Sequence, residues 1–291
     1  MRIAYFDCFA GASGDMILGA LLDAGLELGR LQKELSKLGL PGFSLSERQV
    51  LKNGLGGTQA IVEINETSSG HHHHRHLTDI KEIINNSSLD NTVKENSLII
   101  FTRLAEAEAK VHRTGIENIH FHEVGAWDAI VDIVGAVVGL KILGIDRLYC
   151  SPIHLGSGMI SCSHGILPVP APATAELIKG KPAFSTEVTG ELLTPTGAAI
   201  LTTLATAHGP MPPMVSQRVG YGAGKAELTL PNLLRLTIGE AEALEDRSVT
   251  KIFEFIDSKQ EDLAPEIYNY LNTLVNKQKS LVFKGVNSDF L

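Results

Sequence analysis

The chain has 291 residues, of which 44 % are hydrophobic, enough for one large domain with a buried core. Its formal net charge is −8, and its lysines and arginines are scattered along the chain. A long nucleic-acid interface needs a basic stripe, so this composition argues against nucleic acid as a partner but leaves room for a site that binds one nucleotide.

The cysteines and the termini bear on the cellular location. An odd, widely spaced set of thiols is a poor disulfide framework, so we expect a cytoplasmic protein with reduced Cys8, Cys150 and Cys162. The first residues lack the order of a signal peptide because Asp7 and Asp15 interrupt them. The apolar run at residues 129–143 is shorter than the ~20 residues of a membrane span, so no membrane partner is expected.

The first predicted elements are a strand, a turn and a helix. Residues 3–6 are apolar, a glycine-rich turn follows, and a helical pattern covers residues 15–24 until Gly25. This order opens an α/β unit, so we predict an α/β fold, with a mixed α+β arrangement as the alternative. Further helices are predicted at residues 31–38, 90–113 and 126–143 and at Pro172 and Pro195, and strands at residues 43–50, 58–64, 119–124, 147–155 and 233–238.

A polar, acidic stretch at residues 240–247 is typical of a linker. It predicts a metal-handling domain at residues 1–240, followed by a linker and the start of a second domain at residues 241–291. That last segment is too short to close a core of its own.

A predicted strand-to-helix corner can bind a metal. His120 and His122 are two apart in the strand and share a face, and Asp128 and Asp132 are four apart on the helix that follows. With Glu123, two imidazoles and up to three carboxylates can converge there. Imidazole suits nickel, zinc or iron, and carboxylate suits magnesium or manganese. The alternative is a polar corner without a ligand.

A histidine tract lies earlier in the chain. Such tracts bind divalent transition metals through neutral imidazoles, and this one lacks the apolar anchors of a structural loop. The rival interpretation is an expression tag, but this tract is internal and interrupted by Arg75. We expect a storage or delivery loop made of His71, His72, His73, His74 and His76.

The turn between the first strand and helix can hold phosphate. Gly11, Ser13 and Gly14 open the helix, whose free amides are suited to an anion. Asp7 and Asp15 would repel phosphate unless a divalent cation lies between them, which indicates a metal–nucleotide corner. The alternative is an ordinary tight turn with Ser13 as helix cap.

Two further glycine loops can admit a ligand closely. One contains Gly156 and Gly158 and precedes Cys162 and His164, a soft and borderline ligand pair. The other, residues 220–225, ends at Lys225, a candidate phosphate contact.

Long blocks in this order resemble the LarC nickel insertion proteins over residues 1 to about 240. The blocks include FDCFAGASGDMILGALLDAGL, HFHEVGAWDAIVDIVGA, SHGILPVPAPATAELIKG and ELLTPTGAAIL. A histidine-rich insertion at this position is also typical of the family. The resemblance implies insertion of Ni²⁺ into pyridinium-3,5-bisthiocarboxylic acid mononucleotide, forming one nickel–carbon and two nickel–sulfur bonds. It further implies hydrolysis of CTP to CMP aided by Mg²⁺ or Mn²⁺.

Full-length members of this family continue into a second α/β domain implicated in CTP binding. The resemblance therefore implies either the first piece of a two-piece protein, with a separately encoded C-terminal domain as partner, or a shortened copy. We also expect a homo-oligomer. The expected catalytic residues are Asp7, Asp15, Glu123 and Asp128. The expected cofactor-binding residues are Gly11, Ser13, Gly14, Gly156, Gly158 and Lys225, and the expected metal ligands are His71, His72, His73, His74, His76, His120, His122 and Asp128.

Two other functions stay open on the residues. One is a nickel storage or delivery protein without catalysis, which would bind nickel but leave CTP intact. The other is a metal-dependent hydrolase that uses a metal-bound water and needs no CTP.

Overall fold

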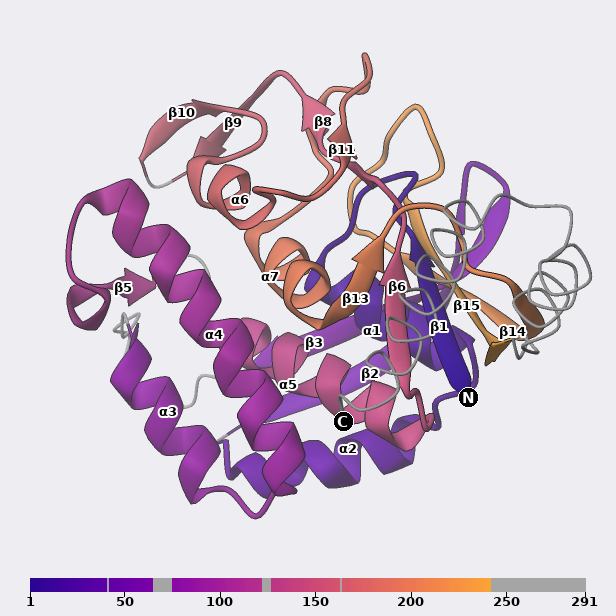
Figure 1. The fold of residues 1–291 in the computed structure, drawn as a ribbon, viewed down its shortest axis with the longest axis horizontal. Helices are drawn as coiled ribbons and strands as arrows, with labels where there is room; N and C mark the ends of the chain where they lie inside the picture. The colour runs from indigo at the N-terminus through magenta and orange to yellow at the C-terminus, as the bar shows by residue number, and fades with distance from the viewer. Residues whose placement is uncertain (41, 65–74, 122–126, 163, 242–291) are drawn as a thin grey trace, which may run out of the picture.

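The computed structural model describes residues 1–40, 42–64, 75–121, 127–162 and 164–241. Seven strands form one sheet in the order β13–β6–β1–β15–β14–β3–β2 (Figure 1). Strands β1, β6 and β13 run parallel, and β15 is antiparallel to both of its neighbours, β1 and β14. These strands are β1 (Arg2–Asp7), β2 (Phe43–Lys52), β3 (Leu55–Ile64), β6 (Arg147–Cys150), β13 (Ala205–His208), β14 (Met214–Ala223) and β15 (Leu233–Ala241). This sheet and its helices confirm the predicted α/β class, in the mixed form.

Helices lie on the sheet in successive layers. Helix α1 (Gly14–Asp23) packs on β14 and β3, α5 (Trp127–Ile142) packs on α1, and α4 (Asn91–His112) packs on α5 (Figure 1). Because α5 lies between two helices, it is apolar on nearly all sides. The other helices are α2 (Leu28–Leu35), α3 (Leu77–Asn86), α6 (Pro172–Leu177) and α7 (Pro195–Leu204), with 3₁₀ turns η1 (Ser36–Leu38) and η2 (Ile116–Asn118).

Local side-chain chemistry begins and ends several helices where the sequence predicts it. Asp90 accepts a hydrogen bond from the amide of Thr92 at 2.9 Å and caps α4. Thr194 accepts one from the amide of Gly197 at 3.2 Å, and Pro195 occupies the first position of α7. Gly25 follows α1 with φ of +98°, a conformation suited to glycine. The predicted stop at Gly25 and the predicted helix start at Pro195 are confirmed.

The predicted glycine loop at residues 220–225 is wrong for its first four residues, which form the end of β14. The glycines serve close packing of the chain on itself. A Cβ atom built on Gly222 would lie 1.8 Å from the carbonyl oxygen of Met16, and one on Gly220 would lie 2.4 Å from the amide nitrogen of Ala24. The backbone of α1 therefore takes the space that the sequence suggested for a ligand.

The predicted strand at residues 147–155 is divided. It forms β6 and then β7 (Ile153–His154), separated by Ser151 and Pro152. The Ser151 hydroxyl donates to the carbonyl of Pro152 at 2.7 Å, and proline has no amide to extend the ladder.

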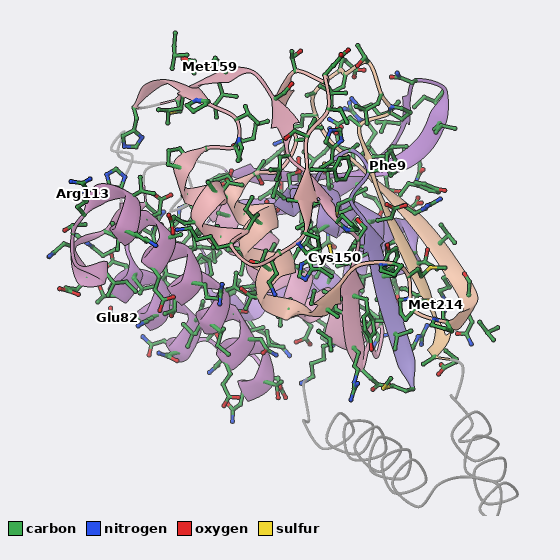
Figure 2. All side chains as sticks on the ribbon, turned by 45° about the horizontal axis from the view of Figure 1, so that its top comes forward. Phe9, Glu82, Arg113, Cys150, Met159 and Met214 are labelled. Carbon is green, nitrogen blue, oxygen red and sulfur yellow. The ribbon has the colours of Figure 1, made fainter. Side chains whose placement is uncertain are left out.

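Short two-stranded ribbons complete the fold. The sequence did not predict the β9–β10 ribbon, and Figure 2 shows Met159 at its start, 60 % exposed, whereas Cys150 lies inside the domain. No helix within the described residues is long and apolar enough to cross a membrane. The ribbons pair β4 (Arg75–His76) with β5 (His120–Phe121), β7 with β11 (Ala183–Phe184), β8 (Gly156–Ser157) with β12 (Gly190–Glu191), and β9 (Met159–Cys162) with β10 (Gly165–Pro168).

Candidate functional site

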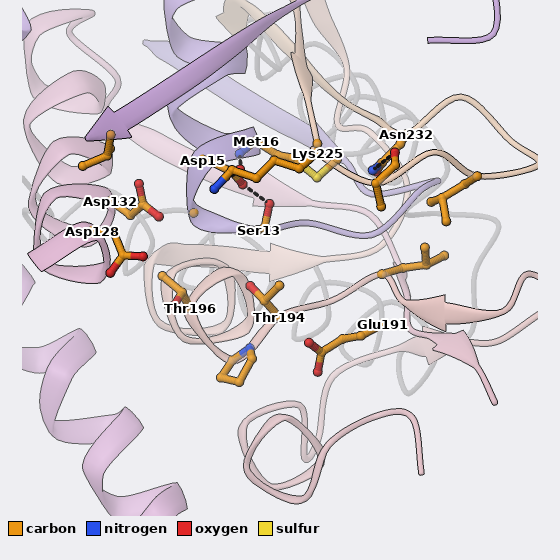
Figure 3. A pocket seen from close by; sticks show the side chains of 17 residues that line it. Ser13, Asp15, Met16, Asp128, Asp132, Glu191, Thr194, Thr196, Lys225 and Asn232 are labelled. Carbon is orange, nitrogen blue, oxygen red and sulfur yellow. Dashed lines mark hydrogen bonds and ion pairs between the residues drawn. The ribbon is translucent and has the colours of Figure 1, made fainter. Parts of the chain in front are cut away.

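A cavity of about 390 Å³ opens where the N-terminal ends of α1, α5 and α7 meet the loop between β14 and β15. Each helix start carries partial positive charge from its free amides, so three helix dipoles lie against one space. The volume is in the range of small-molecule sites. Figure 3 shows carboxylates, threonines and one lysine around this cavity.

The start of α1 contributes Ser13, Gly14 and Asp15 to the cavity wall. The Ser13 hydroxyl donates to the Asp15 carboxylate, and the amide of Met16 donates to the same oxygen at 2.9 Å. The predicted Ser13 cap is right in position, but its side chain does not bond the helix backbone. Gly11, just before it, has φ of +79°, and a Cβ there would lie 2.0 Å from the carbonyl oxygen of Leu192. This glycine is therefore required by the chain's own packing.

The start of α5 contributes Asp128 and Asp132 (Figure 3). The Asp132 Oδ1 atom is shielded from solvent and has no hydrogen-bond partner among the described residues, although part of the residue remains accessible. Burial raises the pKa of Asp132 well above its ordinary value, and the nearby Asp15 and Asp128 carboxylates raise it further. Asp132 packs against Gly14, where a Cβ would lie 2.4 Å from its Oδ2 atom.

The opposite wall is the loop after β14. Lys225 Nζ lies 3.8 Å from Asp15 Oδ2, and 75 % of the lysine side chain is exposed. An ion pair this open contributes little stability, so the ammonium group is available to a ligand. Thr194 and Thr196 line the third side, at the start of α7.

The charges of this cavity suit a ligand with both signs. Asp15, Asp128, Asp132 and Glu191 can attract a cation, and Lys225 and the helix starts can attract an anion. A metal bound near an anionic nucleotide has this pattern of charge.

The structure brings together only some of the predicted site residues. Ser13, Gly14, Asp15, Asp128 and Lys225 all line the cavity, although Lys225 and Asp128 are far from the others in sequence. The structure also adds residues that sequence reasoning missed as site residues: Glu191, Thr194, Thr196 and Asn232. The helix-start pattern Thr-Pro-Thr-Gly could have indicated the threonines.

Asp7, Gly156 and Gly158 do not line the cavity. The Asp7 carboxylate accepts a hydrogen bond from Arg235 on the neighbouring strand β15. Gly156 has φ of +84° and packs against the carbonyl of Gly190, and Gly158 has φ of +86°. Their glycine requirement follows from local conformation and packing.

The structure describes only some of the predicted histidine ligands. His71, His72, His73, His74, His122 and Glu123 lie outside the described residues. His76, the end of the tract, is directly opposite His120 in the β4–β5 ribbon. The Arg75 guanidinium lies 3.5 Å from the ring centre of Trp127, the first residue of α5. Arg75 and His76 therefore bring the end of the tract next to His120 and to the start of α5.

Within the described parts of the chain, no group of three or more histidine, cysteine, aspartate or glutamate side chains is arranged to hold a metal ion. All three cysteines are free, as predicted. Cys8 and Cys150 are buried with their sulfurs 3.5 Å apart. Their contact raises the pKa of the Cys8 thiol, while the same contact and the nearby His208 lower the pKa of Cys150 to about 6. His164 places its ring 4.9 Å from that of His112.

The family model described as nickel insertion protein matches residues 4–281. A relative from Desulfitobacterium hafniense (strain DSM 10664 / DCB-2), named pyridinium-3,5-bisthiocarboxylic acid mononucleotide nickel insertion protein, is 54 % identical over 275 residues, which cover 93 % of this chain and 67 % of the relative. A relative of the same name from Acetivibrio thermocellus is 48 % identical over 278 residues, covering 93 % of this chain and 68 % of its own length. No solved structure matches the chain. The chain thus spans about two thirds of the length of these curated relatives.

Proposed function

The chain belongs to the nickel insertion protein family, and from this premise we propose that it inserts Ni²⁺ into pyridinium-3,5-bisthiocarboxylic acid mononucleotide. The observation that carries the proposal is the cavity itself. It combines the carboxylates of Asp15, Asp128 and Asp132 with Lys225 and three helix starts. A cationic metal and an anionic mononucleotide must meet in one place for this reaction, and the cavity offers groups for both.

The chemistry needs a cation-binding side and a place for one proton. Two thiocarboxylate sulfurs and the ring carbon between them bind the nickel ion. The carbon–hydrogen bond at that carbon breaks, its electron pair forms the nickel–carbon bond, and the proton passes to water, so nickel stays in the +2 oxidation state. We assign nickel capture to Asp15 and Asp128 together with His120 and His122, because imidazole and carboxylate both bind nickel. The histidines are assigned from the sequence.

Binding of the phosphate anion is assigned to Lys225 and the starts of α1 and α7. Free amides and a mobile ammonium group are the usual partners of a phosphomonoester. Ser13 and Gly14 supply the start of α1, and Thr194 and Thr196 supply hydroxyls from α7. Gly11 and Gly156 support these walls through the backbone contacts described above, whereas Gly158 and Asp7, which pairs with Arg235, lie outside the cavity lining.

The dependence on CTP and on Mg²⁺ or Mn²⁺ is part of the proposal through the family resemblance. Because the described residues alone form no complete metal site, we assign no step to the hard metal ion. The proposal includes a cytoplasmic setting, which the free cysteines favour, a homo-oligomer, and a separately encoded partner domain for CTP.

The test is nickel insertion by the purified chain. The mononucleotide, Ni²⁺, CTP and Mg²⁺ are mixed with the chain, alone and with the remaining third of a relative supplied as a separate chain. The product, called the nickel-pincer cofactor, is measured by mass spectrometry and by its activation of a racemase that depends on it. We expect product and CTP hydrolysis with the wild-type chain, a loss of at least about tenfold with Asp15→Asn, and no loss with Glu95→Gln, an exposed residue on α4. Nickel binding without product under both conditions would refute insertion and favour a storage protein.

A further inference from the structure

A buried lysine lies behind the wall of the cavity that carries Lys225. Lys52 ends strand β2, and only 7 % of its side chain is exposed. Its ammonium group has three donors. They meet the carbonyl of Lys225 at 3.3 Å, the carbonyl of Ala226 at 3.4 Å and the carboxylate of Glu227. The three acceptors belong to consecutive residues, so one side chain holds the backbone carbonyls of Lys225 and Ala226 and the side chain of Glu227.

The rest of this loop is held in the same way. Asn53, the next residue after Lys52, donates to the carbonyls of Leu228 at 3.4 Å and Thr229 at 3.1 Å. From inside the loop, Asn232 donates to the carbonyl of Ala226 at 2.9 Å. The hairpin between β2 and β3 therefore clamps the loop that forms the Lys225 wall.

Stability alone does not account for a charged residue at this position. Burying an ammonium group costs free energy, and Glu227, its only charged partner in the described part of the chain, is 77 % exposed, so the ion pair returns little. By contrast, Lys225 is held by no packing of its own, since its side chain is 75 % exposed and its nearest acid is 3.8 Å away. The direction in which Lys225 leaves the backbone is set by the loop, and the loop is set by Lys52.

We propose that Lys52 is a positioning residue for substrate binding: it holds the loop so that Lys225 reaches the phosphomonoester of the mononucleotide. The inference rests on the proposed function for the identity of the ligand. The hydrogen bonds from Lys52 to the loop are the evidence for the positioning role.

The test measures binding of two probes, pyridinium-3,5-bisthiocarboxylic acid mononucleotide and nicotinic acid mononucleotide, to the full chain by calorimetry. Lys225→Met should weaken binding of both by about tenfold or more, as expected for one charge-assisted hydrogen bond. Lys52→Met should weaken binding by about threefold to tenfold, and the double variant should be no weaker than Lys225→Met alone. Nickel affinity should not fall in any of the three variants, because each substitution removes only positive charge.

Three further variants separate positioning from general effects. Lys52→Arg keeps donors to the loop and should restore most of the affinity. Glu227→Gln should bind within about twofold of wild type, because the carbonyl contacts carry the orientation. Lys37→Met removes a lysine on η1 that pairs with Glu34 on α2, and it should leave mononucleotide binding unchanged. If Lys52→Met fails to fold, Lys52→Gln takes its place in the cycle.

The outcomes are distinct. Additive effects of Lys52→Met and Lys225→Met, or normal binding by a folded Lys52→Met variant, would overturn the positioning role even if the wild-type chain inserts nickel. Conversely, coupled losses in binding nicotinic acid mononucleotide would support it even if no nickel were inserted, which would refute the proposed function alone.

Discussion

Replacing Gly14 by alanine tests whether close contact between α1 and α5 shapes the cavity. Both Gly14 and Gly29 lie in the first turn of a helix, α1 and α2 respectively. Alanine in a helix is favoured over glycine by up to about 1 kcal/mol, so Gly29→Ala, which meets no atom within 4 Å, should stabilise the chain by up to that amount. At Gly14 the new Cβ would lie 2.4, 2.6 and 2.7 Å from the Oδ2, Cβ and Cγ atoms of Asp132.

A contact with the Cβ atom of Asp132 cannot be relieved by rotating its side chain, so α5 must shift. Overpacking of this kind costs about 1–3 kcal/mol, which equals or exceeds the propensity gain. Because the propensity gain is common to both variants, they should differ by about 1–3 kcal/mol in the free energy of unfolding, measured by urea denaturation. Gly14→Ala should also lose nickel insertion, while Gly29→Ala keeps it. If both variants are equally stable and equally active, the described contact does not shape the site.

Asp132 should make the wild-type chain less stable as pH rises. Its pKa is raised in the folded state, so its contribution to the free energy of unfolding is present below the unfolded pKa and is lost as pH rises through the folded pKa. Asp132→Asn should therefore become more stable relative to wild type as pH rises to neutral, measured by urea titration. Parallel pH profiles of the two proteins would contradict this. Thr194→Ala should cost about 1 kcal/mol through the lost cap of α7 and weaken mononucleotide binding, and an unchanged urea midpoint would rule out the capping role. Deleting residues 71–74, which keeps strand β4, should reduce the number of nickel ions bound in equilibrium dialysis and leave the fold intact; an unchanged number would show that the tract is not a metal site. The double change His120→Ala and His122→Ala should abolish cofactor maturation in a folded chain supplied with the remaining third of a relative, and maturation that persists would remove the corner from the mechanism. Limited proteolysis should cut after about residue 240, and a resistant C-terminal segment would show that the boundary is misplaced.

The sequence predicts those parts of the fold that depend on neighbouring residues. The end of α1 at Gly25 and the start of α7 at Thr194 follow from conformational preferences within one turn of helix. The strand character of Gly220 and Gly222 does not, because it depends on the distant helix α1 lying against them. Glycine in a strand and glycine in a loop look alike until the partner is known.

The sequence likewise predicts single residues of the site but not how they come together. Asp15 and Asp128 could be chosen from the sequence because each begins a helix beside other polar residues. Their meeting with Lys225 could not, since it depends on the order of strands in the sheet and on the clamp from Lys52. Asp7 was chosen for its chemistry, and its partner Arg235 lies on β15, a strand that joins β1 only through the tertiary fold.

The β4–β5 ribbon has a kinetic consequence. Because His76 is held opposite His120, every residue from 71 to 75 is within about 18 Å of that point along even a fully extended chain. A nickel ion held by the predicted tract would face the histidine corner at an effective concentration of the order of millimolar, far above any free ion in a cell. Transfer between them would be a first-order event within one molecule, so its rate should not change on diluting the protein, and a chelator in the surrounding solution should compete poorly with it.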